Sequence, residues 1–287
     1  TFNGQDGFAL LGAGKKLTII QATAGLLNLP MFKFIQSAYC SVKGMSFLGL
    51  SSGAQIGSAI ESTVTGVAGP TPMGMDFEDL YIDGNQTGGF SCGIRFTAAP
   101  AQDNNNERAF IKNVDCLRCG TGISFEHYNS LIHQIFGGVL YSCGVGISTA
   151  VSLGGSFSAT GTAFISCSVA DIDLGDNSTH SIDLVNCKSE AGTGFWIRSL
   201  VTTARTDVNV INSTFHGTKN GAFIDFRGSG HIVIQGCQMQ QTGTTRKISM
   251  THASSSLEMY GNFLDIDSIE LVGAMTWGAN KYAGGAP

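Results

Sequence analysis

The stretch "LVNCKSEAGTGFWI", residues 184–197, contains the pattern that decides the fold. An apolar strand is followed by a cysteine, then by a turn of small residues, and then by a second short strand that begins with an aromatic residue. Apolar and polar residues alternate with a period of two just upstream, as expected for a half-buried β-strand. One such unit cannot bury its apolar face alone, so neighbouring copies must cover it.

Further segments repeat this order of strand, marker residue and turn. They are residues 114–125, 140–149, 164–174, 210–226 and 233–250, with a weaker copy at 258–271. The marker residues are Cys116, Cys143, Cys167, Cys187, Ser213, Cys237 and Asn262. Their spacing of about 24 residues predicts the coils of a parallel β-helix, in which each coil contacts only its neighbours. No window keeps apolar residues at helical spacing for three turns, which argues against a helical repeat.

The same pattern predicts the extent of the solenoid. Residues 1–40 are expected to form N-terminal capping coils, 41–272 the parallel β-helix, and 273–287 a C-terminal tail. The predicted fold class is therefore all-β, with one domain of about ten coils that is roughly 50 Å long at about 4.8 Å per coil. The chain starts at Thr1 without an initiator methionine or a signal-peptide pattern, which is typical of a processed or truncated piece of a longer protein.

Composition argues against several classes of partner. Charged residues make up 13% of the chain, against about 25% in a typical soluble domain. The net charge of −5 and the lack of a Lys/Arg cluster predict no nucleic-acid partner. The longest apolar stretch, 24–35, is interrupted by Asn28, Pro30 and Lys33, so no membrane insertion is expected. The sequence also contains neither a phosphate-binding glycine loop nor a nucleophile elbow.

The eight cysteines are predicted to be reduced core residues. With one marker per coil, the sulfur atoms would stack in a single interior column, in which Ser213 and Asn262 replace cysteine in two coils. A disulfide or a metal ligand would not tolerate that replacement. Cys116 and Cys119 have the spacing of half a zinc site, but no second pair follows at ligand spacing. No metal and no cofactor are therefore predicted.

The segment "FEDLYIDG" (77–84) and the recurrent units at 142–147 and 186–195 resemble the right-handed parallel β-helix of the pectate-lyase superfamily. Within that superfamily they are similar to the phage tailspike and tail-fibre depolymerases. The resemblance implies a homotrimer of parallel solenoids, located in a virion tail, or outside the cell if the protein is not viral. It implies a bacterial surface polysaccharide, a capsule or O-antigen, as partner. Lyases, hydrolases, epimerases and adhesins all share this repeat, so it predicts architecture better than chemistry.

A candidate site follows when the second strand of each coil is aligned on its inward apolar residues. The alignment matches Phe195 and Ile197 with Ile172 and Leu174 of the preceding coil. The first predicted outward column is Ser124, Ser148, Asp173, Trp196, Asp225 and Ser249. The second is Glu126, Ala150, Gly175, Arg198, Arg227 and Thr251. One face thus gathers carboxylates, guanidiniums and an indole in a chain with few charges elsewhere.

These residues predict a sugar site with two catalytic carboxylates. The predicted substrate-binding residues are Trp196, Arg198, Arg227 and Glu126, because an indole stacks on a sugar ring and charged groups hold its substituents. Asp173 and Asp225 lie two coils apart, or about 9.6 Å by strand spacing. Inverting glycosidases place their two carboxyl groups roughly 6.5–9.5 Å apart, so Asp173 and Asp225 are the predicted acid and base.

Other functions stay open from the sequence alone. The same residues would suit the exposed surface of a non-catalytic receptor-binding or structural fibre protein. A polysaccharide lyase or epimerase acting on a uronic acid would instead depend on Arg198 or Arg227. The other strand face offers a rival set of site residues, namely Asp183, Asp207, His231 and Glu258. The sequence favours a glycoside hydrolase that binds and cleaves a bacterial polysaccharide, with these alternatives unresolved.

Overall fold

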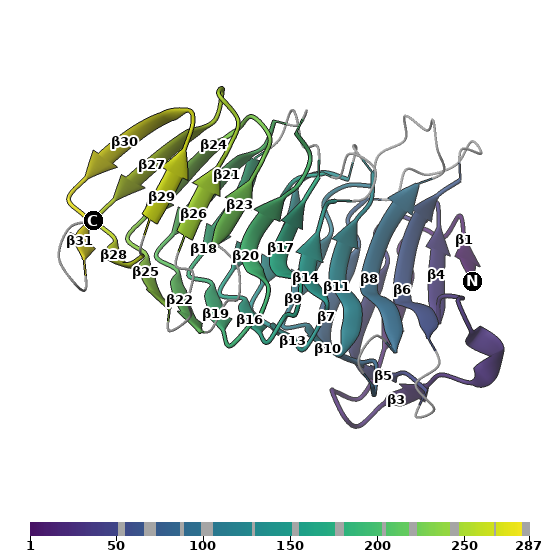
Figure 1. Ribbon diagram of the computed structural model, residues 1–287. Coiled ribbons are helices and arrows are strands. Elements are labelled where there is room, and N and C mark those ends of the chain that lie inside the picture. Colours follow the sequence, from purple (N-terminus) through teal and green to yellow (C-terminus); the bar gives the residue numbers. More distant parts are fainter. Residues whose placement is uncertain are drawn as a thin grey trace.

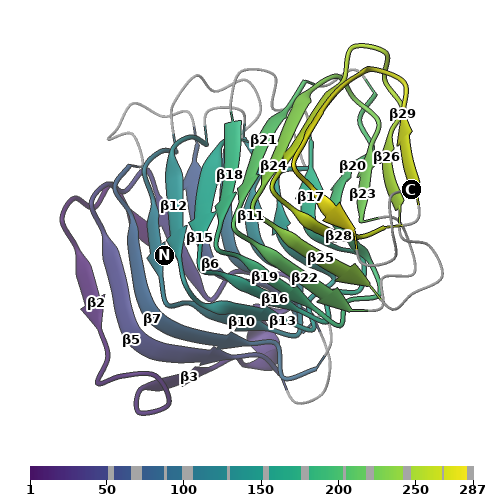
Figure 2. The same cartoon turned by 90° about the vertical axis from the view of Figure 1, so that its left-hand side faces the viewer.

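The computed structural model describes residues 1–50, 55–65, 73–86, 89–98, 106–127, 130–150, 155–175, 181–202, 205–217, 223–241, 247–266 and 268–282. Within them the chain is a single parallel β-helix (Figure 1). Equivalent strands of successive coils pair in parallel, and together they form three faces around a common interior (Figure 2). The predicted fold class, an all-β single-domain parallel β-helix, is confirmed.

Within the described ranges, the first face is one sheet of eleven strands. Its strands, in spatial order, are β1 (Phe2–Asn3), β4 (Phe32–Ile35), β6 (Ile56–Val64), β8 (Phe90–Ala98), β11 (Cys119–Phe125), β14 (Val145–Ser148), β17 (Ala170–Leu174), β20 (Phe195–Ser199), β23 (Ile224–Phe226), β26 (Lys247–Met250) and β29 (Ser268–Leu271).

The second and third faces join at the N-terminal end, because β5 (Ser41–Leu48) and β7 (Asp76–Asp83) run through both. The second face also contains β2 (Ala9–Leu11), β9 (Phe110–Lys112), β12 (His133–Phe136), β15 (Phe157–Thr160), β18 (Ser181–Val185), β21 (Asp207–Ile211), β24 (His231–Gln235), β27 (Ser256–Tyr260) and β30 (Ala274–Gly278). The third contains β3 (Ile19–Gln21), β10 (Asp115–Leu117), β13 (Val139–Tyr141), β16 (Ala163–Ile165), β19 (Lys188–Glu190), β22 (Thr214–Gly217), β25 (Gln238–Gln241), β28 (Phe263–Asp265) and β31 (Lys281–Tyr282).

The solenoid includes the N-terminal coils expected in residues 1–40 and continues into the predicted C-terminal tail. Strand β1 pairs with β4 and β4 with β6, so residues 1–40 contain coils of the same solenoid. Strands β30 and β31 pair in register with β27 and β28, so the predicted tail contains a further coil as far as Tyr282. A short 3-10 helix, η1 (Ala24–Leu26), connects β3 to β4. Among the described residues, no helix is long and apolar enough to cross a membrane.

A ladder of isoleucines sets the register of the first face. Isoleucine pairs with isoleucine through consecutive coils at Ile60, Ile94, Ile123, Ile147, Ile172, Ile197, Ile224, Ile248 and Ile269. All but the last are at most 1% exposed, and each such side chain contributes about 1.5–3 kcal/mol by burial. Ile197 therefore pairs with Ile172, and the predicted match of Ile197 with Leu174 is wrong by two residues.

The marker residues form two columns, so the single predicted column is wrong. Cys119, Cys143 and Cys167 lie two residues after paired positions of the third face, at its corner with the first face. From Cys187 onward the marker lies at the corner between the second and third faces. This change of corner explains the short interval of 20 residues between Cys167 and Cys187. Cys116 lies inside β10 itself and pairs with Leu140.

All eight cysteines are described, and they are buried and form no disulfide. In the second column each side chain after Cys187 accepts a hydrogen bond from the backbone N–H of the marker one coil earlier. Cys187 N–H donates to Ser213 Oγ (3.0 Å), Ser213 N–H to Cys237 Sγ (3.4 Å), and Cys237 N–H to Asn262 Oδ1 (2.8 Å). Asn262 N–H donates in turn to Asn280 Oδ1 (3.0 Å). Cysteine, serine and asparagine can replace one another at this corner because the side chain of each can accept a hydrogen bond.

Replacing Ser213 with Ala is expected to lower the free energy of unfolding by about 1–3 kcal/mol, because the buried N–H of Cys187 loses its acceptor. Ser213→Cys keeps an acceptor of the kind found at Cys187 and Cys237, so it should cost much less. Urea unfolding of both variants measures the difference. An equal loss of unfolding free energy in the two variants would indicate that side-chain volume, and not hydrogen bonding, determines the residue at position 213.

Candidate functional site

The predicted site residues lie on the outer side of the first face, in a different order from the predicted one. Because Ile197 pairs with Ile172, Asp173 pairs with Arg198, and Arg198 pairs with Asp225. We call the whole outward column the charged row; it contains Lys33, Glu61, Arg95, Ser124, Ser148, Asp173, Arg198, Asp225, Ser249 and Glu270.

Trp196 lies in the core, and its predicted role as an exposed sugar platform is wrong. The backbone N–H groups of Trp196 and Ile197 both donate to the carbonyl oxygen of Phe223, at 3.0 and 3.1 Å. Two residues of one strand thus lie opposite a single residue of the next, which is a β-bulge. The bulge turns the side chains of Trp196 and Ile197 to the same side of the sheet. Trp196 is 0% exposed, and its ring centroid lies 3.4 Å from that of Phe215.

Asp173 and Asp225 are both engaged by arginines. Arg198 donates to Asp173 from Nε (2.9 Å) and Nη2 (2.5 Å), and this hydrogen bonding raises the pKa of Arg198. Arg227 donates to Asp225 in the same two-pronged way, at 3.3 and 3.0 Å. Arg198 stands in register between the two carboxylates, where an inverting hydrolase would place the sugar oxygen and the water. Their catalytic role stays a prediction, and this geometry favours a structural role.

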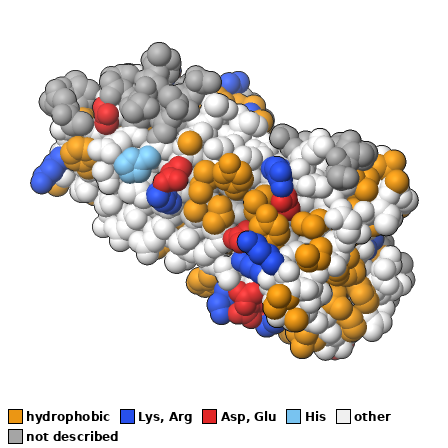
Figure 3. Space-filling model, turned by 90° about the horizontal axis from the view of Figure 1, so that it is seen from below, with side chains coloured by type: hydrophobic (Ala, Val, Ile, Leu, Met, Phe, Trp, Pro, Cys, Tyr) orange, Lys and Arg blue, Asp and Glu red, His pale blue; other side chains and the backbone are white. Residues whose placement is uncertain are grey.

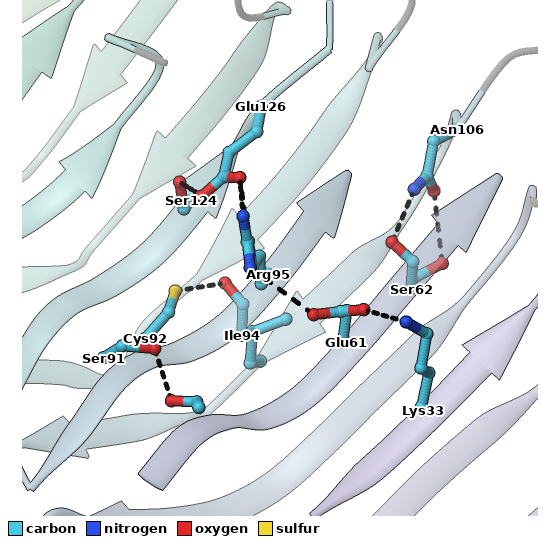
Figure 4. Close-up of polar contacts among 11 residues, drawn as sticks. Lys33, Glu61, Ser62, Ser91, Cys92, Ile94, Arg95, Asn106, Ser124 and Glu126 are labelled. Carbon is cyan, nitrogen blue, oxygen red and sulfur yellow. Dashed lines mark hydrogen bonds and ion pairs between the residues drawn. The ribbon is translucent and has the colours of Figure 1, made fainter. Parts of the chain in front are cut away.

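Glu126 belongs to a second group of ion pairs on the same face (Figure 4). Arg95 donates to Glu126 Oε2 from Nε (2.8 Å) and Nη2 (2.6 Å), and the hydroxyl of Ser124 donates to Oε1 (2.9 Å). Arg95 also lies 3.6 Å from Glu61, which pairs with Lys33 at 2.9 Å. The chain of alternating charges links successive coils of the sheet, so Glu126 is committed to protein contacts.

Two shallow depressions lie in line along the second face. One, of about 310 Å³, is lined by Ile132–Gln134, Ser156–Ser158, Ser181 and Asp183. The other, of about 260 Å³, is lined by Arg205, Asp207, Ser229–His231, Ser254 and Ser256. Three coils line the first depression and the next three line the second, since Ser181 pairs with Asp207. We call the two together the second-face groove, which spans roughly 24 Å at about 4.8 Å per coil.

Serine hydroxyls provide much of the groove lining. They come from Ser156, Ser158, Ser181, Ser229, Ser254 and Ser256. Two of them are oriented by the protein: Ser156 Oγ accepts a hydrogen bond from the backbone of Ile132 (3.0 Å), and Ser256 Oγ lies 2.7 Å from His231 Nδ1. A hydroxyl can both donate and accept, as a sugar hydroxyl does. Such a surface can exchange hydrogen bonds with a chain of sugars along its length.

An acidic centre lies beside the second depression. The backbone N–H of His231 donates to Asp207 Oδ1 (3.1 Å), and His231 Nε2 lies 3.6 Å from Glu258 Oε1. Tyr260 donates its hydroxyl hydrogen to Glu258 Oε2 (3.1 Å). Partial desolvation and the contact with Glu258 raise the pKa of Tyr260, which keeps its hydroxyl protonated. Arg205 lies 3.5 Å from Asp207. Two carboxylates thus flank one histidine at an accessible surface.

The sequence pointed to part of this groove and missed the rest. The rival set is brought together, because Asp207, His231 and Glu258 form the acidic centre and Asp183 lines the first depression. The serines were missed, although a signal exists. In five consecutive second-face strands, β15 to β27, a polar residue directly precedes the first apolar residue, at Ser156, Ser181, Asp207, His231 and Ser256.

His133 also borders the groove, but it is a core residue. Its ring stacks on Phe125 and packs on Phe96, with centroids 4.4 and 4.7 Å away. Nδ1 accepts a hydrogen bond from the backbone of Ala109 (3.1 Å), and Nε2 lies 2.8 Å from Ser130 Oγ. Burial lowers the pKa of His133 to about 3, so the ring stays neutral and takes no part in proton transfer at neutral pH.

The buried neutral His133 makes stability depend on pH. Its pKa is about 3 in the folded chain and about 6.5 when unfolded, so between these values the unfolded state binds the extra proton. Its contribution is fully present above about pH 6.5 and is lost as pH falls toward 3. Thermal unfolding from pH 7 to 4 should show a decreasing midpoint. His133→Phe should reduce this slope, and an unchanged slope would contradict the assignment.

The third face carries an apolar patch on its outer side (Figure 3). Leu117, Tyr141 and Ile165 pair across three consecutive coils, and Tyr141 is 42% exposed. Val139 lies beside them on β13 and is partly exposed. Figure 3 shows charged side chains on either side of the hydrophobic cluster. An exposed patch that repeats over several coils is typical of a surface covered by a partner.

Among the described residues, no group of three or more His, Cys, Asp or Glu side chains is arranged to hold a metal ion. Comparison with known proteins gives no matching family model and no matching curated protein. One similar solved structure is the catalytic domain of a GH87 alpha-1,3-glucanase in complex with tetrasaccharides, at a TM-score of 0.51 and 11% identity. The match covers 99% of this chain and 59% of that one, so the chain spans under two thirds of the glucanase domain. At this identity the likeness extends to the fold alone, a parallel β-helix.

Proposed function

We propose that this chain is a tailspike-like receptor-binding protein that holds a linear bacterial surface polysaccharide along the second-face groove and hydrolyses it. The observation that carries the proposal is the alignment of two depressions over consecutive coils, lined by serine hydroxyls and carboxylates. A long polymer needs an open, extended site, and hydroxyl-rich walls suit its hydroxyl groups. A β-helix of similar fold binds tetrasaccharides in the GH87 glucanase domain, which supports a sugar ligand.

Cleavage is assigned to the acidic centre in this proposal. Glycoside hydrolysis needs one acid to protonate the leaving oxygen and one carboxylate to activate water or attack the sugar. Asp207 and Glu258 are the pair, because they flank His231 beside the second depression. Among the described residues, no arginine donates to both oxygens of either carboxylate. Tyr260 and the backbone of His231 hold the two carboxylates in place through hydrogen bonds. No cofactor is required.

The test is digestion of purified capsule and O-antigen polysaccharides. Hydrolysis should yield shorter oligosaccharides with new reducing ends and no new ultraviolet absorbance. An absorbance from an unsaturated product would identify a lyase, and binding without shortening would identify an adhesin. Either result would refute the hydrolytic part of the proposal. A failure to bind any of the polysaccharides would refute it entirely.

We also propose a homotrimer, with the apolar patch of the third face as the contact between subunits. Burial of Leu117, Tyr141 and Ile165 between subunits would remove this patch from water. Light scattering should give three times the mass of the chain. Tyr141→Lys should shift the protein toward monomer, whereas Lys188→Ala, at the edge of the patch, should not. A monomeric parent protein would refute the trimer.

A further inference from the structure

The second-face groove has an unusual balance of charge for this chain. The carboxylates that line it are Asp183 and Asp207, and Glu258 lies beside it. Among the described lining residues, Arg205 supplies the guanidinium. Asp183 accepts a hydrogen bond from the neutral amide of Asn209 (2.7 Å). Within the described part of the chain, neither Asp183 nor Glu258 forms an ion pair with a lysine or arginine. The groove is therefore an acidic surface.

The outer side of the first face shows the opposite arrangement. Glu61 and Glu126 are matched by Lys33 and Arg95. Asp173 and Asp225 are matched in the same way by Arg198 and Arg227. The fold can thus place a cation beside a carboxylate on an outward strand position. In the groove and beside it, Asp183 and Glu258 have no such cation among the described residues. A ligand that enters the groove therefore meets negative charge that no lysine or arginine balances.

We infer that the polysaccharide held in this groove is uncharged or carries amino groups, and that polymers of uronic or other acidic sugars are rejected. The inference rests on the proposed function and narrows its substrate class. Carboxylates and serine hydroxyls accept hydrogen bonds from sugar hydroxyls, and carboxylates attract an ammonium group. An acidic substituent at the same place would bring like charges together at a partly desolvated surface, which suppresses binding. The same charge balance disfavours the lyase alternative, because its uronic acid substrate would be repelled.

The experiment is a binding panel of bacterial polysaccharides of known composition, immobilised and probed with the intact chain at low and at physiological ionic strength. The panel contains neutral, amino-sugar and uronate- or sialate-containing members. The bound members should all be neutral or amino-containing, with acidic ones about tenfold weaker, a difference that corresponds to about 1.4 kcal/mol of binding free energy. The discrimination should decrease as salt rises, because salt screens exposed charges.

A matched pair of variants separates groove charge from overall charge. Asp183→Lys reverses one charge inside the groove and should reduce the discrimination against acidic members. Glu190→Lys makes the same change on the third face and should leave the discrimination unchanged. Tight binding of acidic members by the parent chain would overturn the inference while the proposed function stands. A panel without any bound member would overturn both.

Discussion

Asp207→Asn and Glu258→Gln should each lower kcat for glycan cleavage by about 10²–10⁴-fold, the usual contribution of one positioned acid or base. Each substitution keeps the shape of the side chain and a carbonyl oxygen, so the hydrogen bonds from the backbone of His231 and from Tyr260 can persist. What is lost is the ability to transfer a proton or to carry negative charge. The dissociation constant for the polysaccharide should therefore change only a few-fold.

Initial rates of reducing-end release, together with titration calorimetry, separate the two quantities. The matched controls are Asp173→Asn and Asp225→Asn on the first face, whose carboxylates are gripped by Arg198 and Arg227. Both should keep kcat within a few-fold, although the loss of an ion pair can lower stability, so folding is checked by circular dichroism at the assay temperature. If Asp173→Asn and Asp225→Asn lost kcat while Asp207→Asn kept full activity, the catalytic carboxylates would be those of the first face.

Trp196→Ala should lower the free energy of unfolding by about 3–5 kcal/mol, the usual cost of emptying a fully buried aromatic site. The indole is 0% exposed and packs on Phe215, and the coils on both sides leave little freedom for the cavity to collapse. Its Nε1 has no hydrogen-bond partner among the described residues, so this nitrogen contributes nothing that Phe would lack. Trp196→Phe should therefore cost much less than Trp196→Ala.

The other tryptophan provides the control. Trp277 is 37% exposed on β30, in the last coil, where it stacks on Tyr282. Trp277→Ala should cost about 1 kcal/mol or less, since a surface change away from a buried network rarely costs more. Guanidinium unfolding followed by circular dichroism compares the three variants. A stable Trp196→Ala protein with weakened glycan binding would restore the indole to a sugar-contacting role.

The repeat was predictable from the sequence because coils must stack their apolar residues. The isoleucine ladder from Ile60 to Ile269 repeats the same residue at each coil, and the strand–turn units around it are visible without a structure. The register of one strand was not predictable by alternation, because the β-bulge at Trp196 places two consecutive side chains inside. Because of this bulge the indole of Trp196 lies in the core and not on the predicted surface. Arg198 occupies the outward position between Asp173 and Asp225 that was predicted for Trp196.

The site was harder to predict than the fold for a physical reason. Outward side chains of a solenoid are under no packing constraint. Charged residues that form ion pairs between coils therefore have the same spacing in the sequence as charged residues that bind a ligand. Only the side-chain contacts separate them: Asp173 is gripped by Arg198, whereas Asp207 receives a backbone N–H beside a depression. The serines of the groove carry no apolar pattern, so the only sequence signal for Ser156, Ser181 and Ser256 is the repeated polar position before the strands.

The hydrogen-bond column from Cys187 to Asn280 runs in one direction along the chain. Each backbone N–H in this column donates to a side chain about one coil later in the sequence. The hydrogen bond at a corner therefore cannot form until the following coil has been synthesised. During synthesis the corner N–H of the newest coil therefore lacks its acceptor until the next coil has emerged. In this column the order in which the coils are translated is therefore also the order in which their corner hydrogen bonds can form.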